Sequence, residues 1–420
     1  MGPTPTLRRY PRRIFPGIAL PVNRMDFLIV GGGIIGLSIA RELKKRHHGA
    51  RILLIEKEDS CGTHASGRNS GVLHAGFYYS ADSLKARFTR QGNIRLTEYC
   101  EARKIPVKKC GKLVLAKNEA ELPWLDELLQ RGEKNGVPLQ SISVQEAREI
   151  EPRMKTFHRA LYSPTTSSID PGRVVDAVKR DALAEGVQIE TGIRYLARSG
   201  HEVLTSMGKL EADYLVNAAG LYADTIARDF GFSKTYRILP FKGLYLYSNE
   251  PPQSFRTNLY PVPDLLNPFL GVHFTVTAEG KTKIGPTAIP AFWREQYEGF
   301  ENFDWGELIE ILFRQAGLFL KSNFDFKKLA YEEIRKYSRN YLVNLASELA
   351  EGINPNHFTQ WGRPGIRAQL FDLKTKKLEM DFVLEGDAQS LHVLNAVSPA
   401  FTCAFPFAEF VCDRIGQLRT

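Results

Sequence analysis

Apolar residues near the start of the chain form two uninterrupted runs, separated by a segment in which they recur at helical spacing. The runs are Phe27–Val30 and Arg51–Ile55, and such runs are typical of strands buried on both faces of a parallel sheet. Between them, Ile35, Ile39 and Leu43 share one face of a helix. The pattern therefore predicts a strand, a tight turn, a helix and a second strand.

Alternating helices and strands are predicted over the next part of the chain. Two helix starts are marked by capping residues, because Ser143 with Glu146 forms a capping box and Asp170-Pro171 supplies an N-cap and a first turn. The expected elements are helices over 83–104 and 119–135, a short helix from Ser143, a helix from Asp170 closed by Gly186, and strands over Lys112–Ala116, over Val187–Glu190 and up to Gly220.

The pattern changes after about residue 236 to extended segments, which predict an antiparallel sheet in a second domain. A chain of 420 residues also exceeds one typical core, so two domains are expected. The expected elements are strands within 241–247, 271–277 and 281–285, long helices over 304–321 and 326–350, a strand near Leu391–Leu394 and a final helix.

Charge changes the interpretation of the N-terminus. The net charge is +9, and five arginines lie in the first 25 residues, where there is no acid: Arg8, Arg9, Arg12, Arg13 and Arg24. The rest of the chain has no basic stripe of the kind that binds nucleic acid, so no nucleic-acid partner is expected. We expect residues 1–24 to be a disordered leader. A targeting signal is the alternative, although five prolines oppose the amphipathic helix that such signals form.

The cysteines and the longest apolar stretch exclude two further classes. The five cysteines are scattered with no Cys-x-x-Cys pair, which argues against a disulfide framework and a thiolate metal site. The stretch Phe27–Ala40 is too short for a membrane span and contains four glycines. We expect a cytoplasmic protein, or a mitochondrial one in a eukaryote, with no metal site.

The turn between the first strand and helix carries a dinucleotide-binding pattern. Gly31, Gly33 and Gly36 form G-x-G-x-x-G, and Glu56 follows at the end of the second strand. Glycines let the backbone approach a pyrophosphate at the positive end of the helix, and the acid accepts hydrogen bonds from a ribose hydroxyl. An acid at this position also disfavours the 2′-phosphate of NADP.

The continuation of the chain favours FAD over NAD. Glu56 leads into the glycine-rich segment 62–76 instead of further strand–helix units, and LVNAAGLYAD (215–224) supplies a distant strand that ends in small residues. Remote segments of this kind suit a long cofactor. No cysteine lies in a setting typical of covalent flavin attachment, so we expect non-covalent FAD.

Further cofactor contacts are expected from segments after the glycine turn. Gly67, Gly71 and Gly76 are expected to let the backbone lie against the flavin where a Cβ would collide. Ser398-Pro399 and Thr402 are expected to begin the last helix, whose dipole would stabilise reduced flavin. The expected contacts beyond the glycine turn and Glu56 are Lys57, Ser66, Asn69, Ser70, Gly71, Val72, Ala219, Gly220, Ser398, Pro399, Ala400, Phe401 and Thr402.

Several longer motifs together resemble one known family. They are GGGIIG, HASGRNSGVLHAGFYY, CGKLV, LVNAAG, LPFKG, LYPVPD, PFLGVHFT, IGPTA, RPGIRAQ and NAVSPAFT. The combination resembles the L-2-hydroxyglutarate dehydrogenase/oxidase family, which are FAD flavoproteins of the D-amino-acid-oxidase-like superfamily, over roughly residues 25–415. One departure is Leu244, where family members commonly carry an acid.

The resemblance implies an α/β fold with two domains. A Rossmann-type FAD-binding domain with a parallel sheet is expected from the discontinuous segments 25–80, 155–235 and 362–420. A substrate domain, built as α+β on a mixed or antiparallel sheet, is expected from 81–154 and 236–361.

The implied reaction is oxidation of a small dicarboxylate 2-hydroxy acid, L-2-hydroxyglutarate or a similar compound, to the 2-oxo acid. A hydride would move to flavin N5, and the electrons would then pass to a quinone or to oxygen. This chemistry requires a base and cations for the carboxylates. Imidazole titrates near neutrality, which makes His74 and His273 the candidates for the base.

The candidate substrate cations are Arg367 first, because a guanidinium offers a planar fork to a carboxylate, and Lys242 second. Tyr78 and Tyr260 are expected to line the pocket. Helices around 304–350 mix apolar and basic residues, so peripheral contact with a membrane, such as an inner membrane, is considered beside ordinary helix packing.

Two other functions remain open from the sequence. An amino-acid or amine oxidase of the same superfamily, similar to glycine or sarcosine oxidase, would share every FAD motif. A non-catalytic flavoprotein that serves as an assembly factor would bind the flavin for structure alone.

Overall fold

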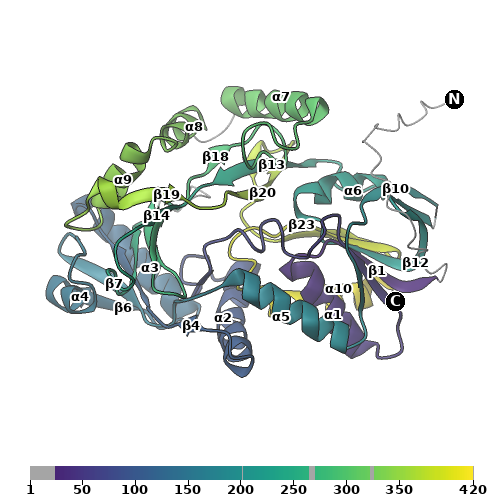
Figure 1. Cartoon of the computed structure of the whole chain (residues 1–420), viewed down its shortest axis with the longest axis horizontal. Helices are drawn as coiled ribbons and strands as arrows, with labels where there is room; N and C mark the ends of the chain where they lie inside the picture. Colours follow the sequence, from purple (N-terminus) through teal and green to yellow (C-terminus); the bar gives the residue numbers. More distant parts are fainter. Residues whose placement is uncertain (1–23, 201, 264–269, 322–325, 420) are drawn as a thin grey trace.

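The computed structural model describes residues 24–200, 202–263, 270–321 and 326–419, without the side chains of 315–321 and 326–330. The predicted leader therefore lies outside the described residues except for Arg24, which forms an ion pair with Asp213. The two ends of the described chain both lie beside the first of two large sheets (Figure 1).

The first large sheet has the order β10-β11-β12-β1-β2-β9, with β23 and β22 added beyond β12. Its centre is parallel, since β1 pairs in register with β12 and with β2. The strands are β1 (Met25–Val30), β2 (Ile52–Ile55), β9 (Gln188–Glu190), β10 (Tyr195–Ser199), β11 (Glu202–Thr205), β12 (Gly208–Asn217), β22 (Val383–Gly386) and β23 (Ser390–Asn395).

Three helices cover one face of this sheet: α1 (Ile34–Arg46), α5 (Pro171–Ala184) and α10 (Ala404–Arg419) (Figure 1). Ile39 and Leu43 of α1 are buried in the core that these helices share. Helix α2 (Leu84–Ala102) packs against α10 and contributes Phe88 to the same core. The amphipathic spacing of α1 therefore positions the glycine turn at the carboxyl end of β1.

The second large sheet has the order β19-β14-β17-β16-β15-β5-β7-β6 and is mixed, because β15 and β5 are parallel and the other pairs are antiparallel. Helices α3 (Leu122–Lys134), α4 (Val144–Ile150) and α9 (Arg339–Ser347) accompany it. The strands are β5 (Lys112–Leu115), β6 (Gln140–Ser143), β7 (Arg159–Ser163), β14 (Leu246–Ser248), β15 (Asn258–Pro261), β16 (His273–Val276), β17 (Thr282–Gly285) and β19 (Phe358–Trp361).

Two smaller sheets connect the large ones. One has the order β18-β13-β20-β21 and the other the order β3-β8-β4. Helix α6 (Ala223–Asp229) follows β12, and α7 (Trp305–Lys321) and α8 (Phe326–Arg335) lie beyond β18 (Figure 1). The remaining bounds are β3 (Val72–Leu73), β4 (Val107–Lys108), β8 (Ser167–Ile169), β13 (Tyr236–Gly243), β18 (Ile289–Pro290), β20 (Gly365–Asp372), β21 (Lys377–Leu378) and the short helices η1 (Glu119–Glu121), η2 (Gly220–Tyr222) and η3 (Pro355–His357).

The predicted fold class is confirmed, and most predicted elements are present. Both predicted caps also exist, since Ser143 and Glu146 form the complete capping box and Asp170 accepts from the first turn of α5. Two predictions were wrong in detail. The helix expected over 326–350 is split into α8 and α9, and the last helix begins at Ala404 because Ser398–Cys403 form turns.

The predicted division into domains stays a prediction, and two elements differ in their packing from what that division implies. Strand β7 joins β5 and β6 in the second sheet, although it falls in a segment expected in the cofactor domain. Helix α2 packs on the core of the first sheet, although it falls in a segment expected in the substrate domain.

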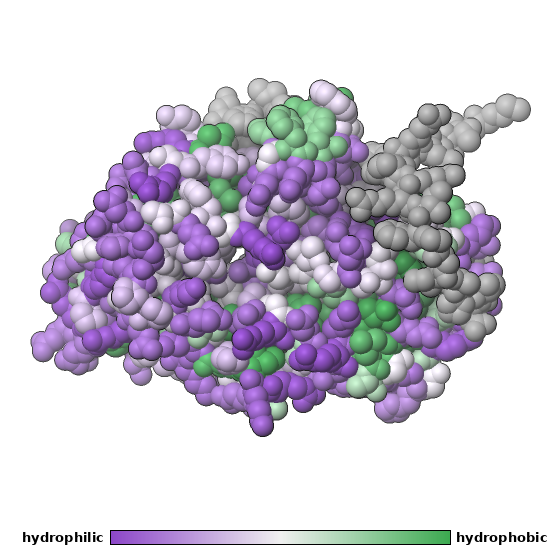
Figure 2. Space-filling model, in the orientation of Figure 1, coloured by the Kyte–Doolittle hydropathy of each residue, from purple (hydrophilic) through white to green (hydrophobic). Residues whose placement is uncertain are grey.

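Figure 2 shows apolar side chains gathered on the outer face of α7. Trp305 and Phe313 are 70% and 83% exposed, and Ile309 between them is also exposed. No helix in the described parts of the chain is both long and apolar enough to cross a membrane. Peripheral membrane contact through this face stays a prediction.

Candidate active site

The glycine turn has the geometry that a pyrophosphate requires. Gly31 has φ +115°, and a Cβ there would lie 2.5 Å from the Ala218 carbonyl oxygen. A Cβ on Gly36 would lie 2.0 Å from the Gly31 carbonyl oxygen. Gly33 is the N-cap of α1 and supplies no side chain to its first amides. The turn is therefore closed to side chains, as the close approach of an anion to the N-terminus of α1 requires.

Glu56 ends β2 at this turn as predicted and is buried. Its carboxylate accepts the Gly32 amide at 2.7 Å and the Glu58 amide at 2.9 Å. A carboxylate has about four lone-pair sites, so capacity remains for a ribose hydroxyl. Ser66 is held nearby, because its Oγ accepts the Ile34 amide at 2.9 Å.

Lys57 lies in a charged cluster beside Glu56. Its ammonium is 2.7 Å from Glu295 Oε1 and also pairs with Glu58. His64 Nε2 is 2.9 Å from Glu58 Oε1, and this pairing with His64 and Lys57 lowers the pKa of Glu58 to about 2. Ligand atoms of Glu58, His64 and Glu295 lie within 4.8 Å of one another, as in some metal sites. Because Lys57 pairs with both Glu58 and Glu295, the cluster fits an ion-pair network.

The glycines of the segment after Glu56 have a different reason from the one predicted. A Cβ on Gly67 would lie 2.4 Å from the Gly62 carbonyl oxygen, and one on Gly71, at φ +76°, would lie 2.3 Å from the Ile169 carbonyl oxygen. Gly76, at φ +109°, faces Thr89 at 3.2 Å. Close contacts within the protein thus require these glycines, whether or not a cofactor also lies against them.

Asn69 and Ser70 brace the same segment through the backbone. Asn69 accepts the Gly71 amide at 2.8 Å and donates to the Ser66 carbonyl at 2.8 Å, and Ser70 Oγ accepts the Val72 amide at 3.3 Å. Their hydrogen bonds shape the loop that leads into β3.

Segments that are remote in sequence meet at His74. Its backbone amide donates to Thr402 Oγ1 at 3.2 Å, which joins the end of β3 to the turns that precede α10. Those turns contain the other predicted contacts of this region, Ser398, Pro399, Ala400 and Phe401. Ala219 and Gly220 lie in the turn after β12, where Ala219 donates to Asn217 Oδ1 at 3.2 Å and Gly220 has φ +54°.

His74, His273 and Tyr260 belong to one buried cluster. The rings of Tyr260 and His273 stack with centroids 3.7 Å apart and planes 19° apart. Both imidazoles are buried, and burial lowers the pKa of His273 to about 3 and holds the pKa of His74 well below its usual value. His273 also lowers the pKa of His74, and both imidazoles are neutral at pH 7.

The cations that act on both histidines are Arg367 and Lys112. Burial already lowers the pKa of His74 and of His273, and the positive charge of each of these two residues lowers both pKa values further. Arg367 lies on β20 opposite Phe241 of β13. Lys112 begins β5 and is 1% exposed. Arg367 was predicted from the sequence, whereas Lys112 was not.

Lys242 does not join this cluster. It follows Phe241 in β13 and pairs with Ile366, whereas Arg367 pairs with Phe241. Because successive side chains of a strand point to opposite faces, Lys242 and Arg367 lie on opposite faces of this sheet. Burial lowers the pKa of Lys242, and Glu298 is the charged group that opposes this shift.

The strand register places a row of polar residues on one face of the second sheet. Lys283 of β17 pairs with Thr275 of β16, and Asn258 of β15 pairs with Lys112 of β5. Antiparallel pairing of β15 with β16 at Leu259 and Phe274 places Asn258 opposite Thr275. The neighbouring row on this face contains His273 and Tyr260. The two lysines thus flank the aromatic stack, and Lys283 was also missed by the sequence.

Several buried polar atoms of this region have no hydrogen-bond partner among the described residues. They include His74 Nδ1 and Tyr78 Oη. Buried polar groups are nearly always satisfied in folded proteins, so such atoms indicate the place of a ligand or water. Tyr78 and Tyr260, both predicted to line a pocket, are buried against Lys112.

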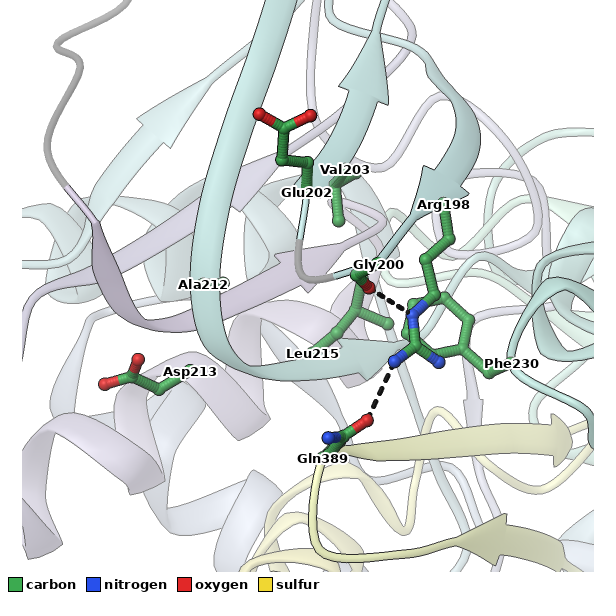
Figure 3. A pocket seen from close by; sticks show the side chains of 9 residues that line it. All are labelled: Arg198, Gly200, Glu202, Val203, Ala212, Asp213, Leu215, Phe230 and Gln389. Carbon is green, nitrogen blue, oxygen red and sulfur yellow. Dashed lines mark hydrogen bonds between the residues drawn. The ribbon is translucent and has the colours of Figure 1, made fainter.

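A separate surface pocket lies beside the first sheet, and Figure 3 shows its lining. The Arg198 guanidinium donates to the Gly200 carbonyl and to Gln389 Oε1, each at 2.8 Å, and lies 4.4 Å from the Phe230 ring. None of the predicted site residues lines this pocket. Its polar groups are satisfied, so it is no rival to the histidine cluster.

Three curated relatives of the chain carry the same enzyme name. The chain is 34% identical to L-2-hydroxyglutarate dehydrogenase, mitochondrial, of Nematostella vectensis, over 94% of this chain and 91% of the relative. It is 35% identical to L-2-hydroxyglutarate dehydrogenase of Indibacter alkaliphilus, over 93% and 98%. It is 34% identical to the mitochondrial enzyme of Homo sapiens, over 94% and 89%.

Solved structures share the fold. L-alpha-glycerophosphate oxidase from Mycoplasma pneumoniae with FAD bound superposes with a TM-score of 0.74 at 22% identity, over 94% of this chain and 95% of that one. Glycine oxidase from Geobacillus kaustophilus superposes with a TM-score of 0.67 at 20% identity, over 94% and 96%. Residues 26–414 match the FAD dependent oxidoreductase family. The chain belongs to this DAO family of FAD-dependent oxidoreductases.

Proposed function

We propose that the chain oxidises L-2-hydroxyglutarate, or a similar L-2-hydroxy acid, to the corresponding 2-oxo acid. The observation that carries this proposal is a pair of buried neutral histidines, His74 and His273, within the electrostatic reach of Arg367 and Lys112. A base beside two cations suits a hydroxy acid that carries two carboxylates. The name shared by the curated relatives supports the same substrate.

The residues around the glycine turn fit FAD. The turn excludes any Cβ at Gly31 and Gly36, the N-cap residue Gly33 has no side chain, and Glu56 retains acceptor capacity. Gly31, Gly33 and Gly36 would therefore hold the pyrophosphate and Glu56 the ribose. FAD, when bound, supplies the flavin N5 that accepts a hydride.

His273 has the tautomer that a base requires. Its Nδ1 lies 2.8 Å from the Gly271 carbonyl oxygen, which can only accept a hydrogen bond. Nδ1 therefore carries the proton, and Nε2 is left with a free lone pair. The stack on Tyr260 fixes the ring plane. His273 Nε2 is accordingly the atom that would receive the hydroxyl proton of the substrate.

A dianionic substrate would itself raise the basicity of His273. The charges of Lys112 and Arg367 contribute to its low pKa of about 3, after burial. Carboxylates bound to these cations would offset that contribution and bring the pKa of His273 toward neutrality, where a general base is most effective. The site would thus become competent when the substrate is bound.

Arg367 is the proposed partner of the carboxylate next to the reacting carbon, because a guanidinium binds a carboxylate through two parallel hydrogen bonds. Its charge acts on both histidines and on Tyr245 and Tyr79, so it lies centrally in the cluster. His74 is proposed to border the substrate through its unpartnered Nδ1.

We propose that FAD is held non-covalently. Cys403, the cysteine beside the predicted contact Thr402, is fully buried against Thr89, and burial raises the pKa of its thiol to about 12. A thiol in this setting is a poor nucleophile. A quinone or oxygen remains the proposed electron acceptor.

Anaerobic bleaching of the flavin absorbance tests this proposal. The purified holoenzyme is mixed with L-2-hydroxyglutarate, its D enantiomer, and a panel of amino acids and amines including glycine and sarcosine. We expect rapid bleaching by L-2-hydroxyglutarate and none by the amines. Bleaching by an amino acid alone would assign the chain to an amino-acid oxidase instead, and bleaching by no compound would favour a non-catalytic flavoprotein.

A further inference from the structure

Lys112 is a buried lysine with no acidic partner. It is 1% exposed, and none of the described residues gives it an ion pair or a hydrogen bond. Three aromatic rings surround its ammonium, with centroids at 4.1 Å for Tyr260, 4.9 Å for Tyr78 and 5.5 Å for Phe77. Burial lowers its pKa to about 7.

Such a side chain is costly for the fold alone. Lysines are almost never fully buried unless they are paired, and aromatic rings compensate only part of the hydration that an ammonium loses. The Tyr78 hydroxyl, whose ring centroid lies 4.9 Å from the same ammonium, also lacks a hydrogen-bond partner among the described residues. A buried ammonium without an acidic partner among the described residues suits the binding of an anion.

The position of Lys112 relative to His273 has a defined geometry. The imidazole of His273 covers one face of the Tyr260 ring at 3.7 Å. An ammonium 4.1 Å from the centroid of that ring must lie against the opposite face, because the first face is already occupied. The ring of Tyr260 therefore separates the ammonium from the imidazole by the sum of two stacking distances, which an extended five-carbon diacid can span.

We propose that Lys112 binds the second carboxylate of a dicarboxylate substrate and thereby determines substrate specificity. This inference rests on the proposed oxidation of an L-2-hydroxy acid. In this arrangement the hydroxyl carbon lies at His273 and Arg367, and the chain of the substrate passes the edge of Tyr260 to reach Lys112. A monocarboxylate would leave the Lys112 ammonium unpaired.

Lys112 fits this role better than Lys283, the other unpaired lysine of the sheet face. Lys112 is the strongest cationic influence on the pKa of both His74 and His273, whereas Lys283 affects only His273, and more weakly. Lys283 lies against Tyr245 at 4.4 Å and Tyr247 at 5.5 Å. It also interacts with Glu279, which partly offsets its charge.

The test compares ligands that differ only in the second carboxylate. Glutarate and pentanoate are titrated into the holoenzyme and binding is measured by calorimetry, while L-2-hydroxyglutarate and L-2-hydroxypentanoate are compared as substrates in anaerobic flavin reduction. Lys112→Met keeps the length of the side chain and removes its charge. Lys109→Met is the matched control, because Lys109 is 65% exposed and pairs with Glu101 at the surface.

We expect Lys112→Met to weaken glutarate binding by roughly 10- to 100-fold, the loss typical of a hydrogen bond to a charged group. Pentanoate binding and the reduction by L-2-hydroxypentanoate should change by less than about threefold, so the preference for the diacid should collapse. Lys109→Met should keep the preference of the wild type. Glutarate affinity of the wild type should also fall as pH rises above about 7, and this dependence should disappear in Lys112→Met.

An unchanged ratio of glutarate to pentanoate affinity in Lys112→Met would overturn the inference, as would an equal loss for both ligands. If that variant does not fold, Lys112→Gln gives the same comparison. The outcome is distinct from failure of the proposed function, because a wild type that L-2-hydroxyglutarate does not reduce would refute the function before any variant is made.

Discussion

The buried polar groups of the two large sheets differ in their hydrogen bonding. In the first sheet, His392 is 0% exposed and both ring nitrogens have partners, Asn217 at 3.1 Å and Ser390 at 3.0 Å. In the second sheet, His273 is also buried, but among the described residues only its Nδ1 has a hydrogen-bond partner, the Gly271 carbonyl oxygen at 2.8 Å. Similar burial therefore accompanies different hydrogen bonding.

The same contrast holds for buried cations. Arg294, packed beside the first sheet, is 2% exposed and forms two hydrogen bonds with Asp224, at 2.8 and 3.1 Å. Lys112 in the second sheet is as deeply buried, and none of the described residues gives it an acidic partner. Satisfied groups of this kind stabilise the fold, whereas unsatisfied ones cost stability and mark the place where a ligand completes the hydrogen bonding.

The largest expected effect distinguishes His273 of the second sheet from His392 of the first. His273→Asn removes the proposed base, so the rate of anaerobic flavin reduction should fall by roughly 10²- to 10⁴-fold, the usual contribution of a general base. Flavin content and the melting temperature should stay close to those of the wild type. Stopped-flow reduction by L-2-hydroxyglutarate measures the rate.

His392→Asn is the matched control for that prediction. It breaks the hydrogen bonds to Asn217 and Ser390, so it should lower the unfolding free energy by about 1–3 kcal/mol and leave the reduction rate within a few-fold. Equal losses of rate in the two variants would contradict the contrast between the sheets, because a structural role for His273 would then explain both.

Removing one buried cation from each region should have opposite effects on stability. Arg294→Met leaves Asp224 buried without its partner, which should cost about 3–5 kcal/mol of unfolding free energy. Lys112→Met removes a buried charge that has no partner, so the melting temperature should not fall. Denaturant unfolding of the two variants measures the difference, and a destabilised Lys112→Met would show that Lys112 supports the fold.

The sequence predicted the first region more completely than the second. The glycine turn and Glu56 are local signals, because the turn, helix and strand that give them meaning lie within one short segment. The motifs around His74 and His273 also identified these two histidines as candidates for the base. Their convergence with Arg367 could not be derived from spacing, since it depends on pairing between distant strands.

Two lysines show why the rest of the site could not be predicted from the sequence. Lys112 was missed because a lysine at the start of an apolar strand is ordinarily assigned to the surface, and its burial results from parallel pairing of β5 with β15. Lys242 was predicted as the second candidate cation, and it lies in LPFKG, one of the motifs that carry the family resemblance. The register with β20 places Lys242 beside Ile366 and so on the face away from Arg367. Side chains alternate between the two faces of a strand, so a shift of one residue decides whether a side chain faces the site.

The smallest expected effect is a difference in pH dependence. The pKa of Lys112 is about 7 in the folded chain and near 10.5 when unfolded, so the unfolded state binds more protons between these values. The unfolding free energy gained from this group therefore rises with pH in that window, by at most about 1.4 kcal/mol per unit. Removing Lys112 should flatten the slope.

The measurement is the unfolding free energy of wild type, Lys112→Met and Arg294→Met between pH 7 and about 8.5. Other groups that ionise there, such as unfolded thiols, contribute equally to all three chains and cancel in the difference between slopes. Arg294→Met should keep the wild-type slope, because the pKa of Arg294 is raised by Asp224 and lies far above this range. Parallel slopes for wild type and Lys112→Met would mean that the Lys112 ammonium is paired in solution, and the contrast between the two sheets would then rest on the histidines alone.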